Sequence, residues 1–169
     1  YIVLAHIHFY RNDIDTFLLE AEKTLEINPN SPDGLAAIGT YIGHIGQWGR
    51  GAALVRKATM LDPKFPGWFH FVFGHEHFTR GEYDAALSEY LQIHLPDYFW
   101  AQVFLVTSYG HLGRGEDAER ALKHLLELYP NFGEQVWAEF AKWNWRDQDV
   151  VRVVEGLRKA GLDIPDVTH

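Results

Sequence analysis

Cysteine is absent from the 169-residue chain, and its absence excludes several kinds of chemistry together. Without thiols there is no disulfide, no cysteine nucleophile and no zinc site built on thiolates. This pattern is typical of proteins from a reducing compartment, and we therefore predict a cytoplasmic location.

Long apolar runs are also missing. The densest apolar patch, residues 68–73, is six residues long and includes His70, whereas a membrane-spanning helix needs roughly 18 apolar residues or more. We therefore expect a soluble protein that has no membrane partner.

Basic residues are in the minority, with 15 Lys and Arg against 23 Asp and Glu and a formal net charge of -8. No basic run occurs along the chain. Because binding to a phosphate backbone needs clustered positive charge, the composition predicts no nucleic-acid partner.

Catalytic and metal-binding motifs are lacking as well. Ser31, Ser88 and Ser108 stand outside any nucleophile-elbow sequence, and no glycine-rich phosphate loop is present. The tightest histidine cluster is His75-Glu76-His77, and residues two apart on a helix point in nearly opposite directions. We predict no enzyme activity, no cofactor and no metal site.

What the sequence does contain is a repeat. Pro29, Pro63, Pro96 and Pro130 recur at intervals of 34, 33 and 34 residues. Between them lies a second marker, glycine-x-aromatic-x-x-small, at 46–51 and 81–86, with a weaker copy at 113–118. Proline ends a helix and glycine permits a tight turn, so each period predicts one helical hairpin.

The apolar spacing predicts ten helices in five pairs, and no strand alternation competes with it. The predicted pairs are 1–10 with 14–27, 32–44 with 48–61, 67–79 with 83–94, 99–111 with 115–128, and 133–144 with 148–160. We interpret residues 1–169 as a single domain. Its hairpin units are 1–29, 30–63, 64–96, 97–130 and 131–162, followed by a tail at 163–169. The chain opens at Tyr1 inside an apolar stretch and without an initiator Met, so we expect a longer parent polypeptide.

This period and the Gly81-x-Tyr83-x-x-Ala86 motif resemble the tetratricopeptide repeat family over nearly the whole chain. The resemblance implies an all-α, right-handed solenoid of about five antiparallel hairpins. Two departures stand out: the third unit has an irregular register, and Gly51 takes a position where the family usually has alanine. Segments 95–100, 112–114, 125–132 and 155–162 are also similar to the C-terminal tails of bacterial cyclase and regulator proteins.

In this family the first helix of each hairpin lines a concave face, and that frame implies a groove rich in aromatic side chains and histidine. The predicted groove residues are Thr40, His44, Trp68, Phe71, His75, Trp100, Val103, Thr107, His111, Trp137 and Trp145. Trp68, Trp100 and Trp137 occupy equivalent unit positions, and each of them is suited either to partner contact or to packing between helices.

Two hypotheses of function follow. In the first, the chain is a scaffold that holds a protein or peptide, as an extended segment or a helix, in the concave groove. In the second, it is a regulatory or self-associating tail that controls an attached N-terminal signalling domain of cyclase or DNA-binding type. A homo-oligomer is possible under the second hypothesis.

Overall fold

The computed structural model describes residues 1–166, and in this range it contains ten helices and no strands. The helices are α1 (Ile2–Tyr10), α2 (Ile14–Ile27), α3 (Pro32–His44), α4 (Trp48–Leu61), α5 (Phe69–Thr79), α6 (Tyr83–Tyr90), α7 (Phe99–Leu112), α8 (Gly115–Leu128), α9 (Phe132–Ala141) and α10 (Asp147–Lys159). The all-helical fold class predicted from the sequence is confirmed.

Local chemistry explains where these helices begin and turn. Ser31 caps α3, because its Oγ accepts a hydrogen bond of 3.1 Å from the backbone N–H of Gly34, and Pro32 fills the first helical position. Gly46 and Gly81, the glycines of the repeated marker, lie in the turns between paired helices with φ of +90° and +78°. The marker thus works through a backbone conformation that other residues rarely adopt.

Two helices are shorter than predicted. The expected helix 83–94 ends at Tyr90, and the expected helix 133–144 ends at Ala141. In both places a residue with positive φ, His94 or Asn144, redirects the chain. The reversals bury Ile93 and Trp145, so tertiary burial overrides the helical periodicity at these ends.

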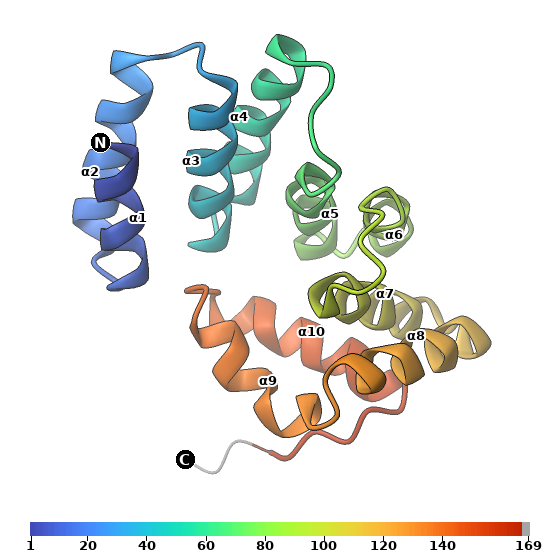
Figure 1. Cartoon of the computed structure of the whole chain (residues 1–169). Coiled ribbons are helices and arrows are strands. Elements are labelled where there is room, and N and C mark those ends of the chain that lie inside the picture. Colours follow the sequence, from blue (N-terminus) through green and yellow to red (C-terminus); the bar gives the residue numbers. More distant parts are fainter. Residues whose placement is uncertain (167–169) are drawn as a thin grey trace.

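The first eight helices form successive antiparallel pairs, whereas the last pair is splayed. Helix α10 packs along α7 and makes few contacts with α9. Thr107 Oγ1 donates to the carbonyl oxygen of Val153 at 2.9 Å, and His111 Nε2 donates to that of Arg152 at 2.7 Å. Helix α9 consequently runs across the inner side of the curve, and the α9–α10 turn returns to the ends of α1 and α3 (Figure 1).

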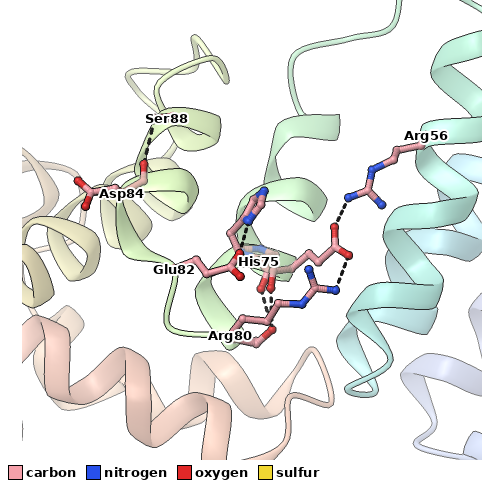
Figure 2. Close-up of polar contacts among 9 residues, drawn as sticks. Arg56, His75, Arg80, Glu82, Asp84 and Ser88 are labelled. Carbon is pink, nitrogen blue, oxygen red and sulfur yellow. Dashed lines mark hydrogen bonds and ion pairs between the residues drawn. The ribbon is translucent and has the colours of Figure 1, made fainter.

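A carboxylate links the second pair to the third. Glu76 on α5 is buried and accepts hydrogen bonds from Arg56 on α4 and, at 2.8 Å, from Arg80, the residue directly after α5. Figure 2 shows the guanidinium groups of Arg56, from α4, and Arg80, from the end of α5, pointing toward the same carboxylate. Because both arginines stay about half exposed, their charges keep much of their hydration while they neutralise the buried acid.

Helices α3 and α4 cross at a pair of glycines. A methyl group on Gly51 would lie 2.3 Å from the carbonyl oxygen of Gly39, and one on Gly39 would lie 2.7 Å from that of Gly51. The two backbones therefore touch, which explains why this chain has glycine where the resembled family usually has alanine.

We predict that Gly51→Ala lowers the free energy of unfolding by about 1–3 kcal/mol, because overpacking forces the helices apart. Urea unfolding measures the change. Gly115→Ala is the matched control, since nothing lies within 4 Å of the added methyl group; it is expected to be neutral or mildly stabilising. An unchanged stability of Gly51→Ala would contradict the close crossing.

Candidate partner-binding pocket

A pocket of about 220 Å³ lies on the inner side of the curve. Its first wall, from α3, α5 and the turn before α5, consists of Thr40, His44, Trp68, Phe71, Val72 and His75. Its second wall, from α7 and the residue before it, consists of Tyr98, Trp100 and Phe104. Phe140, Trp143 and Trp145, from α9 and the turn after it, complete the lining.

The α9–α10 corner, residues 142–146, supplies the wall opposite α3 and α5. Trp145 is buried, and its ring centroid lies 5.6 Å from that of Phe104, 5.0 Å from that of His75 and 5.3 Å from that of Trp48. The last hairpin therefore reaches helices of three earlier pairs through one indole.

The same corner joins the end of the chain to its beginning. Asn144 Nδ2 donates a hydrogen bond of 2.7 Å to the backbone carbonyl of Phe9, 135 residues earlier. The Trp143 ring lies 5.3 Å from His44 and 6.1 Å from Tyr10, and the Arg146 side chain lies over Gly46. The groove is thus closed across its inner side instead of remaining an open channel.

His44 and His75 face each other across the base of the pocket, with ring centroids 6.4 Å apart. His75 Nδ1 is hydrogen-bonded to the Tyr90 hydroxyl at 2.8 Å. No hydrogen bond within residues 1–166 engages the buried Nδ1 of His44. Burial lowers the pKa of His44 to about 3; burial first, and then the neighbouring His44, hold the pKa of His75 well below its usual value. Both imidazoles are neutral at physiological pH.

Seven of the eleven predicted groove residues line this pocket. They are Thr40, His44, Trp68, Phe71, His75, Trp100 and Trp145. Their chemical use in binding remains a prediction, but the structure places them together.

The other four, Val103, Thr107, His111 and Trp137, are placed elsewhere. Val103 is fully buried in the core, and Thr107 and His111 bond to carbonyl groups of α10. Trp137 packs against the core from α9. The family rule that the first helix of each hairpin lines an open groove does not hold for these residues. The later turns of α7 are covered by α10, and α9 leaves the regular stack.

Five lining residues were not predicted: Val72, Tyr98, Phe104, Phe140 and Trp143. Phe104 follows Trp100 by one helical turn, so the i, i+4 rule gave a signal for it. Trp143 had no such signal, because its position depends on the reversal at Asn144.

Other features of the described residues bear on metals and membranes. No group of three or more His, Asp or Glu side chains in residues 1–166 is arranged to hold a metal ion. Glu76 is engaged by its two arginines and His77 by Glu82 at 2.5 Å, so neither converges with His75. Within the same range, every helix is too short or too polar to cross a bilayer.

The paired helices and their inward-curving stack define the fold as a tetratricopeptide-type solenoid. Two crystal structures of MamA have this arrangement, each with a TM-score of 0.63 and 20% sequence identity. The first alignment covers 92% of this chain and 94% of that protein, and the second covers 94% and 88%. At this identity the likeness establishes the fold alone.

No family model matches the chain. Protein bimA of Emericella nidulans is 28% identical over 131 residues, which are 76% of this chain but 16% of that protein. The chain therefore spans about a sixth of the length of this relative. The resemblance to tails of bacterial cyclase and regulator proteins has no counterpart in these matches and stays a prediction.

The buried neutral histidines predict an acid-sensitive fold. A histidine in the unfolded state has a pKa of about 6.5, whereas burial lowers its pKa in the folded state. At any pH between these two pKa values the unfolded state binds more protons than the folded state. Stability is full above about pH 6.5 and falls at lower pH, by up to roughly 1.4 kcal/mol per pH unit for each histidine.

We expect His44→Phe to reduce this slope, measured as the change in unfolding free energy between pH 7 and pH 5. His124→Phe, on the partly exposed α8 position, should keep the parent slope. Carboxylates whose pKa is lowered by hydrogen bonds, such as Asp13, contribute equally to all three proteins. Equal slopes for the parent and His44→Phe would show that His44 titrates normally in the folded state.

Proposed function

We propose that this chain is a protein-interaction module that anchors one apolar side chain of a partner protein or peptide in the inner pocket. The observation that carries the proposal is the lining itself: four tryptophan side chains converge with Phe, Tyr and neutral His on one cavity. Large rigid aromatic side chains dominate the energetics of recognition surfaces because they contribute apolar area at a small cost in conformational entropy.

The closed groove favours anchoring over the threading of a long segment. An extended strand or a helix along the inner face would collide with the α9–α10 corner, where Asn144 is bonded to Phe9. A single side chain needs only the pocket itself and not a continuous channel along the inner face. The pocket lining includes no Lys, Arg, Asp or Glu, so selection by a charged terminus of the partner is not supported.

A second function, self-association or docking on an attached domain, is favoured by exposed apolar side chains on α1 and immediately before it. Tyr1, Val3, Leu4, Ile7 and Tyr10 are all exposed there. Contiguous exposed apolar surface is characteristic of an interface. Sedimentation at increasing concentration distinguishes this function from the first, since pocket anchoring does not require a dimer.

The pocket proposal is tested with peptides selected by display on the immobilised chain. Thr40 lines the pocket, and Thr40→Phe places a ring in the cavity. We expect the affinity of selected peptides to fall at least tenfold, or about 1.4 kcal/mol.

Thr59→Phe is the matched control. Both threonines lie on helices and bond to a carbonyl in the preceding turn, at 2.7 Å for Thr40 and 2.8 Å for Thr59, but Thr59 is on α4 outside the pocket. Equal binding by the two variants and the parent would rule out the pocket as the partner site.

A further inference from the structure

The pocket has the size of one ring system. Its volume is about 220 Å³, whereas drug-sized ligands occupy sites of about 300–1,000 Å³. A dry apolar cavity of about 150 Å³ is large enough to bind benzene. A group of one or two rings therefore fills the space, and a folded peptide does not fit within it.

The charge state of the walls selects an uncharged group. Aromatic faces attract cations, but a desolvated cation also needs a counter-charge. No carboxylate lines the pocket, and the buried Glu76 nearby is already paired with Arg56 and Arg80. An anion would meet no cationic side chain, because the lining has no Lys or Arg and both imidazoles are neutral.

The walls also retain hydrogen-bonding capacity. His44 lines the pocket and is more than nine-tenths buried, and no hydrogen bond within residues 1–166 engages either nitrogen of its ring. Nδ1 is shielded from the cavity, whereas Nε2 keeps accessible surface, so Nε2 is the nitrogen that can meet a ligand. Thr40 Oγ1 donates its proton to the carbonyl of Ala36 at 2.7 Å, so it can only accept from a ligand. A buried polar atom without a partner calls for an occupant that completes its bonding.

We infer that the pocket binds a neutral aromatic ring carrying one hydroxyl or N–H group on its edge, a phenol or an indole, with His44 as the hydrogen-bonding partner of that group. The inference rests on the proposed function and names the chemistry of the anchoring side chain, tyrosine or tryptophan. A free small aromatic compound presents the same chemistry.

Calorimetric titration with p-cresol and toluene tests the edge group, because the two compounds share the ring and differ in the hydroxyl. On the parent protein we expect p-cresol to bind at least fivefold more tightly than toluene. His44→Phe is expected to abolish this preference while toluene affinity changes less than twofold, and His124→Phe should retain the preference. Circular dichroism checks folding; should His44→Phe not fold, His44→Leu, which also removes both ring nitrogens, replaces it.

Two further titrations separate the alternatives. If N-acetyl-tyrosinamide and p-cresol each bind, the occupant is a side chain of a partner. If p-cresol binds and N-acetyl-tyrosinamide does not, the occupant is a free small molecule. Both outcomes keep the phenol or indole class. Tighter binding of tetramethylammonium than of p-cresol would overturn it in favour of a cation cage. Equal affinity for toluene and p-cresol would also overturn it.

Failure of this inference is distinguishable from failure of the proposed function. If no ring compound binds but selected peptides still lose affinity in Thr40→Phe, the ligand class is wrong and the pocket remains the partner site. If Thr40→Phe changes the affinity of neither the ring compounds nor the selected peptides, the ligand class and the proposed function are both wrong.

Discussion

Contacts of the α9–α10 corner with α1, α3, α5 and α7 hold the two ends of this helical stack together. Trp145 lies against Phe104 and His75, Trp143 lies against His44, and Asn144 bonds to the backbone of Phe9. A stack in which each hairpin touches only its neighbours has no contact of this range. Here Trp143 and Asn144 bring the last hairpin against the first, while the pocket itself is lined by the second to fifth hairpins.

Helix α7 makes this closure possible. It packs against α6 and α8 as a member of the stack and against α10 through Thr107 and His111. A methyl group on Gly110 would lie 2.0 Å from the carbonyl oxygen of Gly156, so α7 and α10 meet at backbone distance. With α10 fixed in this way, α9 crosses the inner face, and its turn reaches α1 and α3 (Figure 1).

The repeat and the all-helical fold were predictable because they depend on local chemistry. Proline spacing and the glycine turns act within a few residues, and the turn glycines appear in the structure where the sequence places them. The resembled family places the first helix of each hairpin on the concave face, and this rule located the inner-wall residues of the second and third hairpins. Thr40, His44 and His75 lie on helices that keep the regular stack.

The closure of the groove was not predictable from those signals. It depends on Asn144 taking a positive φ and on α10 displacing α9 from the stack, and both result from packing between hairpins distant in sequence. Trp137 and Thr107 were assigned to the groove on a regular frame that the last hairpin does not follow. Trp143 lies in the α9–α10 corner, so its place in the pocket depends on this packing and could not be predicted from helical periodicity.

The closure can be measured directly because the chain has no cysteine of its own. Arg11→Cys and Lys142→Cys, both at exposed positions next to the joined segments, accept a pair of spin labels. Pulsed electron resonance should give a single narrow distribution at short distance in the unliganded protein. A broad distribution at long distance would show that the two ends are separate in solution and would contradict the closed pocket.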